Sequence, residues 1–468
     1  MSKQRTLRWF GLCLAVGAAG CGPGGSGSGS DGESGGSASA TGTSASTSTT
    51  SSATSTEGGT ASGDSGGTTV ASGTGSATGS GTASSSTSGF KFDVGAETGT
   101  VGCEQKCGFS EWSYVWLANS GEGTISKINT RTMAEEGRYW TRPDAAGNPS
   151  RTSVSIDGKA VVVANRAGGV TKFWQVPSLC EDKNNNNVID TSTGKNDVLP
   201  FDQEECVAWY TAFPEATSQR PVAWTPGTYN PETCEYDDQK VWTAMAKGDG
   251  GTWPCSGSDG IWTYLLDGET GAIDAEIHMP DVSCGGTLGP YGAAVNAEGD
   301  LWMYIWSAFT IVHVDLQTLQ YETIQGGSYG ITVDTKGRVW VGDHPRRYDP
   351  VTKTWADPIG WPGGAGGAGV AQDLQGRIWT ATQGGVAWVD METMQYGDTV
   401  ALPEGGLYRG VGVDVDGYIW AVLLGGTTAH RIHPETYEVA TYDGLNAPYT
   451  YSDFAGGQIN NVTCNPAG

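Results

Sequence analysis

A run of Asp and Asn residues between Cys180 and Cys206 has a spacing that suggests metal binding. Its side-chain oxygens recur at the spacing of a calcium-binding loop: Asp182, Asn184, Asn186 and Asp190. In such a loop alternate side chains turn towards one point, and the backbone carbonyl of Val188 would add a ligand. Asn187 stands where the turn needs a left-handed residue, a conformation that Asn tolerates. The spacing therefore predicts a structural Ca²⁺ ion in the segment 180–206.

The loop departs from this pattern at its last ligand position, which is occupied by Thr193. Because Ca²⁺ takes about six to eight oxygen ligands, another acidic residue would have to complete the site. The candidates are Asp197, Asp202 and Glu204. The alternative is a metal-free cluster of Asx turns that a disulfide between Cys180 and Cys206 holds in place.

A second group of reactive side chains lies in the short segment GDHPRR. Asp343 and His344 could act as an acid–base pair, with Arg346 and Arg347 holding an anionic group beside them. The alternative is a solvated loop, because no nucleophile or second carboxylate is implied nearby. The sequence contains no zinc-protease or phosphate-loop motif.

Internal repeats show which elements position these residues. Four segments align directly, at spacings of 38, 39 and 41 residues, and each ends on a tryptophan: Trp302, Trp340, Trp379 and Trp420. Each has an alternating strand, a turn marked by Gly and a second strand, and two further strands follow. Looser copies end on Trp242, Val161 and Trp116. Seven such units predict an all-β fold, a seven-bladed β-propeller without helices.

The first unit lacks an innermost strand, and the C-terminal stretch PYTYSDFAGG has the pattern of one. We therefore expect the C-terminus to complete blade one and remove an open sheet edge. Cys464 would then lie near Cys103 or Cys107 and bond to one of them. Cys255 and Cys284 map to neighbouring loops of the ligand face and are expected to pair, whereas Cys234 has no assigned partner.

The N-terminus indicates export. Residues 1–21 combine a basic start, a short apolar stretch and small residues before Cys21, which is typical of a lipoprotein signal peptide. The alternative is cleavage by the ordinary signal peptidase. Residues 22–89 are almost entirely Ser, Gly, Thr and Ala, so we expect a disordered tether. An even number of the remaining cysteines agrees with disulfide formation outside the cytosol.

Residues 90–468 form the predicted propeller domain and contain 23 basic and 47 acidic residues, a net charge near −24. Such a charge disfavours nucleic acid and anionic lipid surfaces as partners. We expect a monomer, held at the outer membrane or cell surface through the lipid on Cys21.

The units SYVWLANSGEGTISKINTRT and YGITVDTKGRVWVGD…RRYDPVTKTW resemble the YVTN/NHL-like propellers and, among them, the streptogramin lyases. The resemblance covers about residues 112–442 and implies the seven-bladed fold. It also implies a magnesium-dependent elimination with a His base, but those lyases carry Glu three residues after the repeat Trp. Only Asp343 keeps an acid at that position, so lyase activity does not carry over.

The predicted function is therefore a tethered binding module for a protein, a peptide or a glycan, with a structural calcium loop. The alternative is a lyase-like or hydrolytic enzyme that uses His344 and Asp343. A purely structural envelope protein is a third interpretation.

Overall fold

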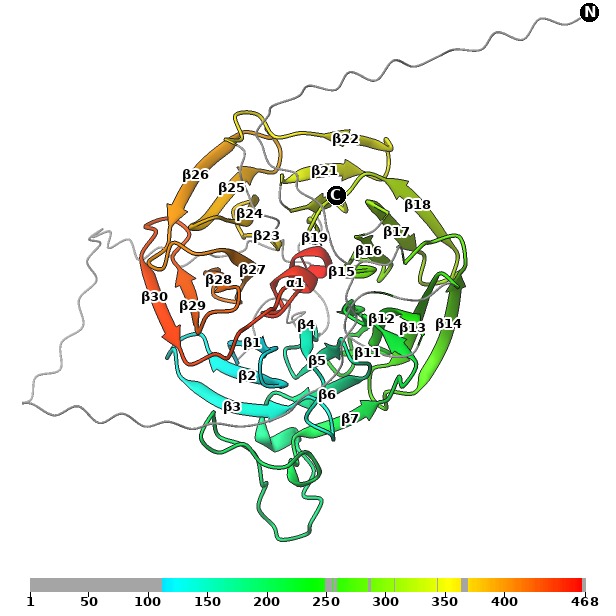
Figure 1. Cartoon of the computed structure of the whole chain (residues 1–468), viewed down its shortest axis with the longest axis vertical. Coiled ribbons are helices and arrows are strands. Elements are labelled where there is room, and N and C mark those ends of the chain that lie inside the picture. The colour runs from blue at the N-terminus through cyan, green and yellow to red at the C-terminus, as the bar shows by residue number, and fades with distance from the viewer. Residues whose placement is uncertain are drawn as a thin grey trace, which may run out of the picture. The chain divides into compact units, whose positions relative to one another are not determined.

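The computed structural model describes residues 112–248, 255, 259–284, 288–306, 308–342, 344–362 and 369–464. The chain divides into two compact units, 1–94 and 95–468, and every described residue belongs to the second. Seven antiparallel sheets follow one another around a ring, so the predicted β-propeller is confirmed (Figure 1). The predicted signal peptide, lipid-bearing Cys21 and tether lie outside the described residues.

The strands run outwards from the centre of each blade in chain order. Blade one contains β1 (Tyr114–Asn119), β2 (Thr124–Asn129) and β3 (Glu135–Trp140). Blade two contains β4 (Pro149–Val154), β5 (Ala160–Asn165), β6 (Val170–Trp174) and β7 (Val207–Thr211). Blade three contains β8 (Ala216–Thr217), β9 (Val222–Trp224), β12 (Lys240–Lys247), β13 (Ile261–Asp267) and β14 (Ile273–Met279), with a separate hairpin of β10 (Thr228–Asn230) and β11 (Glu235–Asp237).

The remaining four blades each have four strands. Blade four contains β15 (Pro290–Val295), β16 (Leu301–Ile305), β17 (Thr310–Val314) and β18 (Tyr321–Gln325). Blade five contains β19 (Ile331–Val333), β20 (Val339–Val341), β21 (Arg346–Asp349) and β22 (Thr354–Ala356). Blade six contains β23 (Val370–Gln372), β24 (Arg377–Thr382), β25 (Gly385–Asp390) and β26 (Tyr396–Ala401), and blade seven contains β27 (Tyr408–Val413), β28 (Ile419–Leu423), β29 (Thr428–Ile432) and β30 (Val439–Asp443).

The repeat tryptophans are core residues held by buried aspartates. Trp340, Trp379 and Trp420 have no exposed surface. Each indole N–H donates to the aspartate six residues earlier, at 2.7–2.8 Å: Asp334, Asp373 and Asp414. The second oxygen of each aspartate accepts backbone N–H groups of the turn between the first two strands. One carboxylate thus shapes the turn and orients the tryptophan in each of these three blades.

The C-terminal segment takes the innermost position of blade one, as predicted. The Trp116 N–H donates to the Phe454 carbonyl at 2.9 Å, and the Tyr449 N–H donates to the Ala118 carbonyl at 3.3 Å. Residues 449–454 do not form a regular strand, because these two hydrogen bonds are too few to make a ladder. The first and last parts of the described chain nevertheless meet here, which closes the ring.

The prediction that the fold has no helix is wrong. Helix α1 (Gly457–Cys464) follows this segment and lies in the centre of the ring (Figure 1). Asp453 accepts the backbone N–H groups of Gln458 and Ile459, and Ile459 and Val462 are buried. The segment is rich in Asn, Thr and Gly, which are weak helix formers, so sequence propensity does not predict it. Burial in the channel and capping by Asp453 stabilise the helix instead.

Candidate functional site

Four tyrosines meet at one mouth of the central channel, and we call them the tyrosine cluster: Tyr291, Tyr329, Tyr449 and Tyr451. The Tyr291 hydroxyl donates to the Tyr329 hydroxyl at 2.6 Å, and the Tyr451 hydroxyl lies 3.0 Å from those of Tyr291 and Tyr449. Tyr291, Tyr329 and Tyr451 are buried, whereas Tyr449 is partly exposed. Tyr291 and Tyr329 lie at or just before the start of the innermost strands β15 and β19, and Tyr449 and Tyr451 belong to the C-terminal segment that lies beside β1.

Four arginines surround these rings, and we call them the arginine cluster: Arg151, Arg166, Arg220 and Arg409. The Arg151 guanidinium carbon lies 3.4 Å from the ring centroid of Tyr451. The other three guanidinium groups lie 4.5–5.3 Å from a ring of the tyrosine cluster. Such cation–π contacts stabilise charged groups where water is scarce.

The hydrogen-bond partners of Arg151 and Arg166 are neutral. Arg151 Nε donates to the Tyr291 carbonyl at 3.1 Å, and its Nη1 donates to Ser150. Arg166 contacts the side chains of Asn148 and Ser120. Within the described part of the chain, neither guanidinium forms an ion pair, and Arg151 Nη2 and Arg166 Nε have no hydrogen-bond partner.

Burial and like charge act together on these groups. Burial, with the neighbouring guanidinium groups of Arg220 and Arg151, lowers the pKa of Arg166 to about 10. Burial also lowers the pKa of Arg220, and it raises the pKa of the Tyr451 phenol well above its usual value. At neutral pH the mouth therefore combines positive guanidinium groups with neutral hydroxyl groups.

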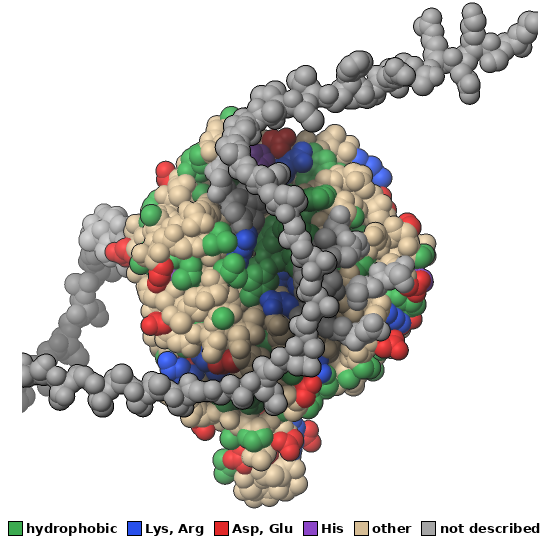
Figure 2. All heavy atoms as spheres, viewed as in Figure 1, with side chains coloured by type: hydrophobic (Ala, Val, Ile, Leu, Met, Phe, Trp, Pro, Cys, Tyr) green, Lys and Arg blue, Asp and Glu red, His purple; other side chains and the backbone are tan. Residues whose placement is uncertain are grey.

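Helix α1 blocks the opposite mouth. Gln458 Nε2 donates to the carbonyl of Val295, the last residue of β15, at 2.7 Å. Asn461 Nδ2 donates to the carbonyl of Gln372, the last residue of β23, at 3.1 Å. These contacts place the helix where innermost strands end, on the side opposite the tyrosine and arginine clusters. Figure 2 shows hydrophobic and basic side chains in the central hollow of the face in view, with both acidic and basic side chains around the outside.

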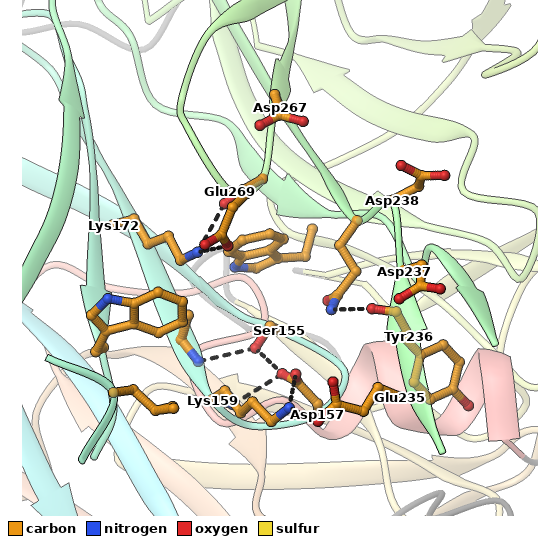
Figure 3. Close-up of a pocket in the computed structure, with 16 residues that line it drawn as sticks. Ser155, Asp157, Lys159, Lys172, Glu235, Tyr236, Asp237, Asp238, Asp267 and Glu269 are labelled. Atoms are coloured by element: carbon orange, nitrogen blue, oxygen red, sulfur yellow. Dashed lines mark hydrogen bonds and ion pairs between the residues drawn. The ribbon is translucent and has the colours of Figure 1, made fainter. Parts of the chain in front are cut away.

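A second cavity, of about 370 Å³, lies between blades two and three and differs in its charges (Figure 3). Lys159 Nζ lies 2.6 Å from Glu235, and Lys172 Nζ lies 3.1 Å from Glu269. The cavity is also lined by Asp157, Asp237, Asp238 and Asp267. Its two lysines therefore have carboxylate partners, unlike Arg151 and Arg166 in the channel.

The GDHPRR residues do not come together as one group. His344 is half-exposed, and its Nε2 lies 3.7 Å from Asp357. Arg346 and Arg347 belong to strand β21 rather than to the loop, so their side chains point in opposite directions. Arg346 Nε contacts Asp357 at 2.6 Å, whereas Arg347 Nη1 donates to the Met391 carbonyl of blade six at 2.6 Å. Asp343, the other candidate catalytic residue, lies outside the described residues.

A buried histidine forms a group that the sequence analysis missed. His430 is fully buried, and its Nε2 lies 2.6 Å from Glu404 and 3.1 Å from the Tyr408 hydroxyl. Burial lowers the pKa of His430, while Glu404 opposes that shift. Because the two residues are 26 positions apart in a loop and a strand, no local motif identifies them.

The Asn-rich segment 180–206 lies between β6 and β7. The short 3₁₀ helix η1 (Pro177–Leu179) comes directly before it, and a second one, η2 (Phe201–Gln203), lies near its end. Asn187 has a φ of 66°, the left-handed conformation expected at its position. The side chains of Asn184 and Asn186 both donate to Asp190 Oδ2, at 2.7 and 2.8 Å. Asp182 accepts the backbone N–H groups of Asn186 and Asn187.

Two acidic residues in the second half of this segment accept hydrogen bonds from neighbouring Ser and Thr residues. Glu204, a candidate calcium ligand, is buried and accepts the backbone N–H and hydroxyl of Ser192. Asp197 accepts the hydroxyl of Thr193. Within the described ranges, no group of three or more His, Cys, Asp or Glu side chains is arranged to hold a metal ion. The segment 180–206 contains the expected turns, in which Asp and Asn side chains accept backbone N–H groups. A calcium ion bound to this segment stays a prediction.

Two predicted disulfides are formed, Cys180–Cys206 and Cys255–Cys284. Cys234 and Cys464 are also disulfide-bonded. Cys103 and Cys107 lie outside the described residues, so the predicted bond between one of them and Cys464 stays a prediction.

No family model and no curated protein matches the sequence. Among solved structures, the chain is similar to virginiamycin B lyase from Staphylococcus aureus, with 15% identity, a TM-score of 0.38, and coverage of 46% of this chain and 72% of the lyase. A streptogramin B lyase has 20% identity and a TM-score of 0.36 over 44% of this chain and 65% of that one. A dihydro-heme d1 dehydrogenase has 10% identity and a TM-score of 0.44 over 72% and 74%.

These likenesses assign no chemistry to this chain, since the identities and TM-scores are low. In the part of the chain that the structure describes, no helix has both the length and the apolar character needed to cross a membrane.

Proposed function

We propose that this protein is an exported lipoprotein whose propeller is a binding module, with its ligand entering the open mouth of the channel. The observation that carries the proposal is the construction of this channel. Helix α1 occupies one mouth, and buried hydroxyl and guanidinium groups converge at the other. Pockets with a few convergent polar groups on an aromatic wall are typical binding sites.

The ligand is a protein, a peptide or a glycan, of which one group reaches the channel mouth. The net charge of −25 disfavours nucleic acid as the partner. The protein acts as a monomer, held at the outer membrane or cell surface through lipid on Cys21 and a tether of residues 22–89.

A calcium ion in segment 180–206 is part of this proposal. Its support is the convergence of Asn184 and Asn186 on Asp190 together with the left-handed turn at Asn187. Asp182, Asn184, Asn186, Asp190 and the Val188 carbonyl would hold the ion, which would stiffen the loop without taking part in binding.

The test starts with peptide and glycan arrays probed with the full chain carrying Cys21→Ser, which removes the lipid. The expected result is capture of one ligand class, with capture kept in His344→Ala and lost when Tyr449 is replaced by Ala. Captured compounds are then incubated with the protein and examined by mass spectrometry. If they are converted, and His344→Ala abolishes conversion while binding persists, the enzyme alternative replaces the binding module.

Attachment to the membrane has its own test. The wild-type chain should sediment with membranes after cell lysis, and Cys21→Ser should move it to the soluble fraction. A chain that is soluble in both forms would contradict the lipid anchor while leaving the binding module intact.

A further inference from the structure

We propose that the arginine cluster binds an oxyanion, a carboxylate, sulfate or phosphate group carried by the ligand. This inference rests on the proposed function and specifies the chemistry of the ligand. Its starting point is the absence of a countercharge for Arg151 and Arg166 within the described ranges.

Burying a charge without a partner costs free energy, so buried guanidinium groups normally face carboxylates. Two other arginines of this chain follow that rule: Arg338 pairs with Asp334 at 2.7 Å, and Arg377 pairs with Asp373 at 2.6 Å. Arg151 is more deeply buried than either, yet its partners are carbonyl and hydroxyl oxygens. In a protein with 51 acidic residues and 26 basic ones, acidic partners are abundant, yet the fully buried Arg151 has none among the described residues.

The cluster has two layers of exposure. Arg151 and Tyr451 are buried, whereas Arg166, Arg409 and Tyr449 are partly exposed. The exposed layer can donate hydrogen bonds directly to an anion, and the buried layer adds positive potential from below. Guanidinium and phenol hydroxyl groups are hydrogen-bond donors, which suits an acceptor-only oxyanion.

The charge distribution of the protein limits the kind of anion that can enter. The acidic outer surface repels a long polyanion, while a single carboxylate, sulfate or phosphate can enter the positive mouth. A terminal carboxylate of a peptide and an acidic group of a glycan therefore satisfy the site equally well.

The experiment measures anion binding to the full Cys21→Ser chain by calorimetry and thermal shift. Inorganic phosphate, sulfate and acetate are compared with chloride at equal ionic strength. We expect saturable stabilisation by at least one oxyanion, weakened at least about tenfold by Arg166→Gln, because a hydrogen bond to a charged group is lost. Arg166 lies in the turn after β5 and is partly exposed, so its replacement should leave the fold intact.

Arg131→Gln is the matched control. It removes the same charge from an exposed arginine paired with Asp416, and it should leave anion binding unchanged. Equal weakening by both variants would show a general charge effect and overturn the inference, as would stabilisation no greater than that by chloride.

The two proposals can fail separately. Capture of an uncharged ligand that is insensitive to Arg166→Gln would overturn the oxyanion site and leave the binding module standing. Saturable phosphate, sulfate or acetate binding without any captured peptide or glycan would support the site but contradict the binding module.

Discussion

The buried aspartates that accept hydrogen bonds from the repeat tryptophans allow a quantitative prediction. Asp334 and Asp414 occupy the same position in blades five and seven, and both are buried. Asp334 Oδ2 accepts hydrogen bonds from Trp340 Nε1 at 2.8 Å and from Arg338 Nε at 2.7 Å. Asp414 Oδ2 accepts from Trp420 Nε1 at 2.8 Å, and Tyr418 stands where blade five has Arg338.

Asp334→Asn should therefore destabilise the protein more than Asp414→Asn. In Asp334→Asn the amide nitrogen faces two donors, and Arg338 keeps only Glu392, at 2.8 Å, as a charged partner. Removal of one partner of a buried ion pair lowers the free energy of unfolding by about 3–5 kcal/mol. Because Arg338 keeps its contact with Glu392, we expect a loss near the lower end of this range. Asp414→Asn loses one hydrogen bond, worth about 1 kcal/mol, and also removes a costly buried charge.

The assay is urea unfolding at pH 7.5, followed by tryptophan fluorescence with the disulfides intact. We expect the unfolding free energies of the two variants to differ by about 2 kcal/mol. Equal losses, or a larger loss in Asp414→Asn, would refute the assigned role of Arg338. Arg338→Met supplies a check, because in its background the two Asn substitutions should cost similar amounts.

The other predictions concern pH, the loop and the helix. Burial raises the pKa values of the Asp414 and Asp453 carboxyl groups to about 6 in the folded protein, above their values in the unfolded chain. Each carboxyl group should therefore increase the free energy of unfolding as the pH falls from about 6 to 4 and decrease it as the pH rises through the same range. Asp414→Asn should flatten this dependence in urea titrations, and an unchanged slope would contradict it. Millimolar Ca²⁺, but not Mg²⁺, should raise the melting temperature of the protein above its value in EDTA. The double substitution Asp182→Ala and Asp190→Ala should abolish this rise. If Ca²⁺ has no effect on the wild-type protein, the segment 180–206 is a metal-free loop. Ile459→Ala should cost about 2–4 kcal/mol in urea unfolding because Ile459 is buried in the channel; a cost near zero would show that α1 packs weakly.

Part of the candidate site was visible in the sequence. Tyr291, Tyr329 and Arg409 each stand eleven residues before a repeat tryptophan, at the first position of the aligned segments. The same repeat position occupies the same place in every blade, so residues at that position form a ring around the channel. The pattern could therefore have indicated that these Tyr and Arg side chains lie close together. Arg166 and Tyr449 lie outside that repeat position, and no local signal links them to it.

The sequence alone determined the number of blades, the core tryptophans and two disulfides, because each depends on a local pattern or a spacing that repeats along the chain. It also indicated that the C-terminus closes blade one. The tertiary structure alone decided that weak helix formers close the channel through α1, that Arg346 and Arg347 diverge, and that Arg151 and Arg166 meet without carboxylate partners. Such features depend on which side chains from distant blades share one buried space, and closing the ring brings those side chains together.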